Sequence, residues 1–121
     1  MRKEHMKMII GGAFQGKAAF AEKKYPEIEW VNGADADWNS IQNAKGVVNF
    51  HEFIRAEMKK NEDVSDLAEK LIQCNPGVLL VSDAFDRAYR EAVGRICTKL
   101  AAYSDEVTRV VCGIGTVIKH D

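Results

Sequence analysis

The sequence contains little proline, little cysteine and little net charge. Two of its 121 residues are proline and nine are glycine, which argues against a fibrous or low-complexity chain. Its three cysteines, Cys74, Cys97 and Cys112, are widely spaced and form no Cys-x-x-Cys pair. This pattern argues against a disulfide scaffold or a zinc site and favours a reducing cytosol. We interpret the cysteines as small apolar core residues.

Charge and hydrophobic patterning restrict the partners. Seventeen basic and 18 acidic residues leave a net charge of −1, whereas a general nucleic-acid binder is usually basic. The longest apolar run, Val78–Val81, is far too short for a membrane helix. The charged start, Met1–His5, is followed by too few apolar residues for a signal peptide. We therefore expect a cytoplasmic protein with neither a nucleic-acid nor a membrane partner.

Short apolar runs alternate with amphipathic stretches along the chain. This alternation predicts an α/β fold with a mainly parallel sheet flanked by helices. The predicted strands are 6–10, 28–31, 46–50, 78–82, 107–112 and 116–119. The predicted helices are 17–25, 38–44 with Asp35 or Asp37 near its start, 51–60, a helix capped by Asp63 and ended by 75–77, and 84–103. The last two strands are so close in sequence that we expect an antiparallel hairpin at the edge of the sheet.

A glycine-rich segment stands between the first strand and the first helix. Residues 11–18 read GGAFQGKA and fit G-x-x-x-x-G-K, the front of the P-loop pattern. Backbone amides of such a loop surround an anion, aided by the positive end of the following helix. The predicted nucleotide-binding residues are Gly11, Gly12, Ala13, Phe14, Gln15, Gly16, Lys17 and Ala18. Lys17 is expected to reach the β- and γ-phosphates; the alternative is a glycine-rich turn with a solvated lysine.

The loop lacks the hydroxyl that binds magnesium in the P-loop pattern, because that position is Ala18. Phosphate binding by backbone amides survives this change, but Mg²⁺ then needs waters and a carboxylate from elsewhere. The candidates are Glu52, Asp35 and Asp83, each near the predicted carboxyl end of a strand, where ligands bind in open α/β sheets. Each can instead cap a helix, and for Asp35 and Asp83 we favour the cap.

A second distinctive block lies near the C-terminus. It reads RAYREAVGR at 87–95, LA at 100–101, DEV at 105–107, VVCGI at 110–114 and IK at 118–119. Together with IIGGAFQGK at 9–17, it resembles the bifunctional adenosylcobinamide kinase/adenosylcobinamide-phosphate guanylyltransferase family of cobalamin biosynthesis. That family shows G-G-A-x-x-G-K-S at its start, and R-x-F-R-E/D-x-x-G-R, L-A, D-E-V, V-V-x-G-I and I-K near its end. The resemblance covers the two ends of the chain and indicates a shortened, divergent member.

The resemblance implies one P-loop nucleotide-binding domain over residues 1–121. It implies a kinase that transfers a phosphoryl group from ATP or GTP, with Mg²⁺, to the aminopropanol hydroxyl of adenosylcobinamide, and it leaves a homo-oligomer open. Lys17 carries over as a catalytic residue. Arg87, Arg90 and Arg95 belong to the signature, although a solvated face or salt bridges to Asp86 and Glu91 also explain them.

The family then transfers GMP from GTP to the new phosphate through a guanylylated histidine. The helix that bears this histidine, with the pattern E-M-x-x-R-I-x-x-H, is absent here. His51 lies outside the terminal tails and is the candidate for a second catalytic residue; the alternative is a polar residue that starts a helix.

Two further departures leave alternatives open. The chain has Ala18 where the family has a serine, and it lacks the segment N-E-x-G-x-G-I-V-P after the strand at 78–82. We therefore expect a kinase and leave the guanylyltransferase step open. One alternative is a catalytically degenerate protein of the same family that binds a nucleotide or corrinoid. Another is a P-loop kinase for a different small substrate.

Overall fold

The computed structural model describes residues 5–12, 16–60, 62–83 and 90–120. These residues form a six-stranded sheet with the order β2-β3-β4-β1-β5-β6. The strands are β1 (Lys7–Gly11), β2 (Trp30–Asn32), β3 (Gly46–Val48), β4 (Leu79–Asp83), β5 (Glu106–Val111) and β6 (Ile114–His120). The helices are α1 (Lys17–Lys24), α2 (Trp38–Asn43), α3 (Phe50–Lys59), α4 (Leu67–Cys74) and α5 (Arg90–Tyr103).

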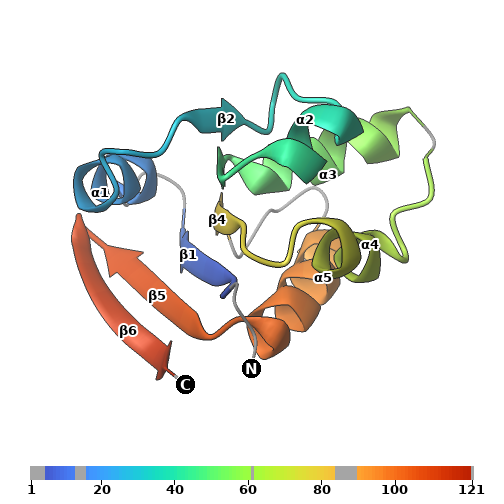
Figure 1. The fold of residues 1–121 in the computed structure, drawn as a ribbon. Coiled ribbons are helices and arrows are strands. Elements are labelled where there is room, and N and C mark those ends of the chain that lie inside the picture. The colour runs from blue at the N-terminus through green and yellow to red at the C-terminus, as the bar shows by residue number, and fades with distance from the viewer. Residues whose placement is uncertain (1–4, 13–15, 61, 84–89, 121) are drawn as a thin grey trace.

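The sheet is mostly parallel. Strands β1 to β5 run in one direction, and β6 pairs antiparallel with β5 at the edge. Figure 1 shows α1 on one side of this sheet and the other helices on the opposite side. The α/β class, the flanking helices and the antiparallel edge hairpin predicted from the sequence are confirmed.

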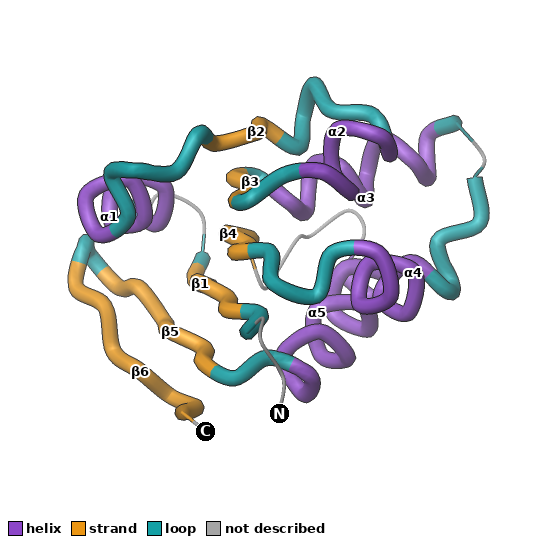
Figure 2. The backbone as a smooth tube through the Cα atoms, in the orientation of Figure 1, coloured by secondary structure: helices purple, strands orange, loops and turns teal. Residues whose placement is uncertain are grey.

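Alternate side chains of the central strands enter two separate cores. Met8 and Leu80 pack against the helices α2 to α5, whereas Ile9 and Val81 pack in the cluster that includes Ala21 of α1. Both faces of β4 are therefore buried, which explains why its sequence shows no polar alternation. Figure 2 shows β4 in the middle of the sheet, between β3 and β1. The two cores hold β1 and β4 side by side in the middle of the sheet.

Several predicted boundaries were wrong by a few residues for local reasons. Strand β3 ends at Val48, because Asn49 adopts a positive φ of 55° and α3 begins at Phe50. Asp37, and not Asp35, caps α2 by accepting a hydrogen bond from the Ser40 backbone N–H at 2.8 Å.

Two further turns differ from the sequence prediction. Asp63 accepts a hydrogen bond from the Ser65 backbone N–H, which makes a local turn, and α4 begins only at Leu67. The hairpin turns at Cys112 and Gly113, both with positive φ, so that β6 already starts at Ile114. The part of the long helix predicted at 84–89 lies outside the described residues.

The cysteines divide between core and surface. Cys97 is buried in the main core, as predicted for a small apolar residue. Cys74 and Cys112 are exposed, so the prediction of a core role was wrong for both. Among the helices of the described residues, none has the length and apolar character needed to cross a membrane.

Candidate functional site

The glycine-rich loop leaves the sheet at the carboxyl end of β1. A Cβ atom at Gly11 would lie 2.6 Å from the carbonyl oxygen of Val110, so only glycine fits beside β5 here. Gly16 precedes α1 with φ 80° and ψ 25°, a left-handed conformation that glycine adopts without strain. Ala13, Phe14 and Gln15 lie outside the described residues. Ala18 is exposed in the first turn of α1.

The Lys17 side chain extends from the start of α1 toward the ends of β1 and β4. Its Nζ donates a hydrogen bond to the Gly12 carbonyl oxygen at 2.9 Å and forms an ion pair with Oδ1 of Asp83. Gly11 and Asp83 are register partners at the carboxyl ends of β1 and β4. Only 10% of the Lys17 side chain is exposed. The ammonium group therefore lies where two adjacent parallel strands end, the usual ligand position in open α/β sheets.

His51 holds Asp83 from the other side. The Asp83 backbone N–H donates to Nδ1 of His51 at 3.0 Å, and the Nε2 atom lies 3.4 Å from Oδ2 of Asp83. A neutral ring that accepts at Nδ1 carries its proton on Nε2, which then points toward the carboxylate. With 8% of its side chain exposed, His51 is a buried ring engaged at both nitrogens.

Glu52 adds a second carboxylate to this group. Its Oε1 atom lies 3.6 Å from the same Nε2 of His51 and accepts a hydrogen bond from Nη1 of Arg55 at 2.8 Å. Glu52 is in the first turn of α3, where a negative charge interacts favourably with the helix dipole. The structure thus brings together four residues that the sequence analysis named separately: Lys17, His51, Glu52 and Asp83.

The two carboxylates meet the minimum requirement for Mg²⁺, which binds proteins through one or two carboxylates and completes its shell with waters and phosphates. Oδ2 of Asp83 and Oε1 of Glu52 both lie within 3.6 Å of one His51 nitrogen. The described part of the chain contains no group of three or more ligating side chains that could enclose a metal ion by itself. Asp83 and Glu52 are thus two oxygen donors that could take part in holding a magnesium ion.

The other predicted residues are placed apart from this group. Asp35 is exposed in the turn after β2, at the sheet edge, with β3 and β4 between β2 and β1. Arg95 is exposed, and its Nη2 bonds to Oε1 of Glu91 at 2.9 Å, the salt bridge expected from the helical spacing. Arg90 begins α5, and Arg87 lies outside the described residues.

Two features of the site were not found from the sequence. The first is Arg55, whose spacing of three from Glu52 on a predicted helix was an available signal. The second is the turn of the β5–β6 hairpin, which approaches the glycine-rich loop. A Cβ at Gly16 would lie 3.4 Å from the Gly113 Cα. No local pattern could have found this approach, since the two glycines are far apart in the sequence.

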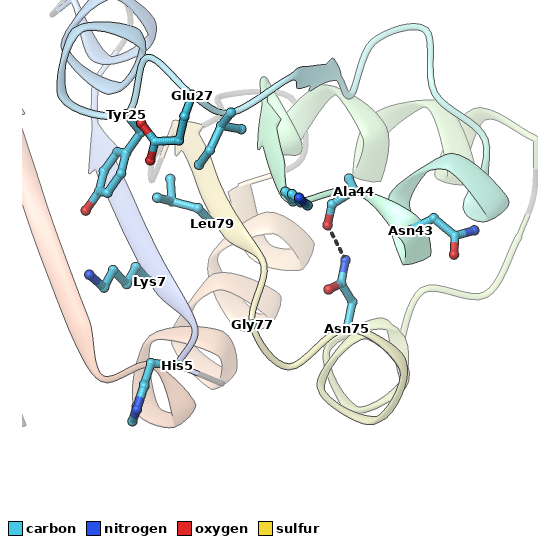
Figure 3. Close-up of a pocket in the computed structure, with 11 residues that line it drawn as sticks. His5, Lys7, Tyr25, Glu27, Asn43, Ala44, Asn75, Gly77 and Leu79 are labelled. Atoms are coloured by element: carbon cyan, nitrogen blue, oxygen red, sulfur yellow. Dashed lines mark hydrogen bonds between the residues drawn. The ribbon is translucent and has the colours of Figure 1, made fainter. Parts of the chain in front are cut away.

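A cavity of about 480 Å³ opens at the opposite end of the same strands. Lys7 and Leu79, which begin β1 and β4, line it, together with Tyr25 and Glu27. Figure 3 shows Tyr25 and Glu27 facing this space across from Ala44, whose carbonyl accepts a hydrogen bond from the Asn75 amide at 2.7 Å. The cavity contains none of the predicted functional residues, so we locate the candidate site at the Lys17 end.

No protein-family model matches the chain, and no curated protein matches it. The proposal that follows therefore rests on the geometry of these residues and on the family resemblance of the two end blocks.

Proposed function

We propose that the protein is a nucleotide-dependent kinase of cobalamin biosynthesis that phosphorylates adenosylcobinamide from ATP or GTP. The observation that supports this most directly is the position of Lys17. Its ammonium group lies at the carboxyl ends of β1 and β4, largely buried, beside the carboxylate of Asp83. The corrinoid acceptor is supported by the resemblance of the block at 87–119 to the adenosylcobinamide kinase family.

The proposed phosphate site combines the end of β1 with the start of α1. The first N–H groups of a helix have no intrahelical acceptor and present a partial positive charge. Lys17 stands in this first turn, so its ammonium group and the helix N-terminus act on the same anion. Phosphoryl transfer requires mainly positioning and stabilisation of negative charge on the transferred group. Lys17 supplies that charge at the phosphate oxygens.

Asp83 and Glu52 would hold the magnesium ion. When bound, the ion neutralises charge on the β- and γ-phosphate oxygens. His51 acts in this proposal as a positioning residue, since its Nδ1 accepts from the Asp83 backbone and its Nε2 faces the Asp83 carboxylate. A buried ring engaged in this way is a poor nucleophile, so the proposal covers the kinase step and not guanylyl transfer.

A second candidate function rests on Ala18. Its methyl group stands where the P-loop pattern has a magnesium-binding hydroxyl. A chain without that ligand can still bind phosphates through the loop and helix α1. The second candidate is therefore a protein that holds a nucleotide or corrinoid without catalysing transfer.

The deciding experiment measures phosphoryl transfer from γ-labelled GTP and from γ-labelled ATP to adenosylcobinamide with Mg²⁺ present. We expect label on the corrinoid with the wild type and with Lys23→Ala, an exposed lysine on the same helix. We expect no transfer with Lys17→Ala. Nucleotide binding without transfer would favour the second candidate. Absence of both binding and transfer in the wild type would contradict both candidates, and full activity of Lys17→Ala would contradict the proposed role of this lysine.

A further inference from the structure

The cavity at the amino ends of β1 and β4 takes no part in the proposed reaction. Its volume of about 480 Å³ lies in the range of roughly 300–1,000 Å³ that is typical of small-molecule sites. Lys7 and Leu79, which line it, are register partners at the starts of the two strands. Gly11 and Asp83 are partners at the other ends of the same strands, so the cavity is separate from the proposed phosphate site.

Hydrogen-bonded turns hold two walls of this cavity. One wall is the connection between α1 and β2, where the Ile28 backbone N–H donates to the Tyr25 carbonyl oxygen at 3.2 Å. On the opposite side, the Asn75 side-chain amide donates to the carbonyl oxygens of Ile41 at 3.0 Å and Ala44 at 2.7 Å. Figure 3 shows Tyr25 across the cavity from Ala44 and Asn75. Both walls are fixed without a ligand, so binding here costs little ordering of the chain.

The inner part of the lining is apolar. Leu79 and Ala44 are buried, with 5% and 7% of each exposed. Tyr25 and Ile28 are half-buried and pack against the same cluster as Leu79. An aromatic face beside branched aliphatic side chains gains free energy when a flat hydrocarbon group covers it. The cavity therefore suits a ligand with a ring.

Basic groups predominate among the charged side chains of the lining, which are Lys7, Lys45, His5 and Glu27. His5 already pairs with Asp105 at 2.7 Å, so the two lysines determine the charge available to a ligand. Lys7 has a looser partner, since its Nζ lies 3.8 Å from Oε2 of Glu106 and 40% of its side chain is exposed. Two lysines against one lining carboxylate leave a single net positive charge.

The Tyr25 side of the cavity carries further positive charge. The Nζ atoms of Lys7 and Lys24 lie 5.8 Å and 5.7 Å from the centroid of the Tyr25 ring. Ammonium groups at this distance are attracted to an aromatic ring and remain near it. An anionic group on a ring that contacts Tyr25 therefore meets a positive environment.

We propose that this cavity binds a small aromatic monocarboxylate. Its ring lies against Tyr25, Ile28 and Leu79, and its carboxylate faces Lys7 and Lys45. The single net charge of the lining favours a monoanion over a polyphosphate. This site is independent of the proposed kinase activity, because it shares no residue with the phosphate site.

The test uses three probes with one ring and different charges: 2-naphthoate, 2-naphthylmethanol and 2-naphthylmethylammonium. Each is titrated into the ¹⁵N-labelled wild type and followed by amide chemical shifts. We expect 2-naphthoate to bind about fivefold more tightly than the alcohol, the gain expected for one solvent-accessible charge pair, and the ammonium compound to bind most weakly. The largest shifts should be at Tyr25, Ala44 and Leu79.

Two matched variants test the lysines. Lys7→Gln with Lys45→Gln should bind 2-naphthoate no more tightly than the alcohol, whereas the affinity for the alcohol should be unchanged. Lys23→Gln with Lys59→Gln removes two exposed lysines outside the cavity lining and should behave like the wild type.

Several outcomes would overturn this assignment. Equal affinities of the wild type for the three probes would show that the cavity is apolar only, and tightest binding of the ammonium compound would show that Glu27 dominates. Shifts confined to Gly11 and Lys17 would place the anion at the phosphate site instead. Absence of shifts with all three probes would show that the cavity binds no such ligand. None of these results would bear on phosphoryl transfer, which is measured separately.

Discussion

Lys17 and Asp83 form an ion pair across the carboxyl ends of two adjacent parallel strands. Only 10% and 16% of their side chains are exposed, so solvent screens the pair less than a surface salt bridge. A triphosphate that binds at the glycine-rich loop brings its own negative oxygens to the same ammonium group. Under the proposed function, Asp83 would therefore compete with a nucleotide for Lys17 until a cation neutralises one of them.

This competition predicts an unusual effect of Asp83→Asn. In the absence of Mg²⁺, the variant should bind GTP about tenfold more tightly than the wild type, because a nearby negative charge has been removed. Added Mg²⁺ should strengthen GTP binding by the wild type more than by the variant. Calorimetric titration with and without EDTA measures both effects. Asp66→Asn, which alters an exposed carboxylate next to α4, is the control. Equal magnesium-free affinities would mean that the ion pair does not oppose the nucleotide.

Alanine substitution at two glycines should change the free energy of unfolding in opposite directions. Gly16→Ala places a Cβ on a residue with φ 80° and should lower the free energy of unfolding by about 1–2 kcal/mol. Gly94 is inside α5, and a methyl group added there would meet only open space, so Gly94→Ala should raise it by about 0.5–1 kcal/mol. Urea denaturation of the wild type and of both variants measures these two changes in the free energy of unfolding. A stabilised Gly16→Ala variant would show that the left-handed conformation is not required before α1.

His51 should contribute to stability through the Asp83 backbone. His51→Ala removes the acceptor of a part-buried N–H and should cost about 1–3 kcal/mol. His51→Asn retains an acceptor oxygen near the position of Nδ1 and should cost less. Urea denaturation ranks the stability of the two variants, and GTP titration measures the proposed contribution of Asp83 to nucleotide binding. An equal loss in both would indicate that the volume of the ring, and not the hydrogen bond, is what matters.

The cap of α2 should make part of the stability depend on pH. The hydrogen bond from the Ser40 backbone N–H, with a smaller contribution from its side chain, lowers the pKa of Asp37 from the ordinary value of 3.8. A lowered carboxyl pKa stabilises the fold above the unfolded-state pKa, and this stability is lost as the pH falls through the folded-state pKa. The stability difference between wild type and Asp37→Ala should therefore shrink below pH 3.8.

Urea denaturation at a series of pH values measures this difference. Asp35→Ala serves as the control. Asp35 is an exposed carboxylate in the same connection between β2 and α2, and it does not cap α2. A difference between wild type and Asp37→Ala that stays constant as the pH falls would contradict the capping role of the charged form.

Local patterns were sufficient to predict the elements and the motif. The unbroken apolar run at 78–81 predicted a buried strand. The prediction succeeded because both faces of β4 are covered, so each residue of the run is apolar. The glycines before Lys17 indicated a connection between strand and helix, and in the structure β1 ends at Gly11 and α1 begins at Lys17. Strand and helix ends were less certain, since a single residue such as Asn49, with its positive φ, shifts a boundary without a clear signal in the sequence.

The sequence by itself determined the α/β class, the loop that ends at Lys17 and the antiparallel hairpin, because each depends on neighbours along the chain. Only the tertiary structure decided that Asp83 is the partner of Lys17, that His51 orients Asp83, and that Gly113 adjoins Gly16. These relationships follow from the placement of β4 and β5 on either side of β1. The order of strands in a parallel sheet depends on how helices and strands that are distant in sequence pack together in the two cores. The spacing of apolar residues within one segment carries no information on that order.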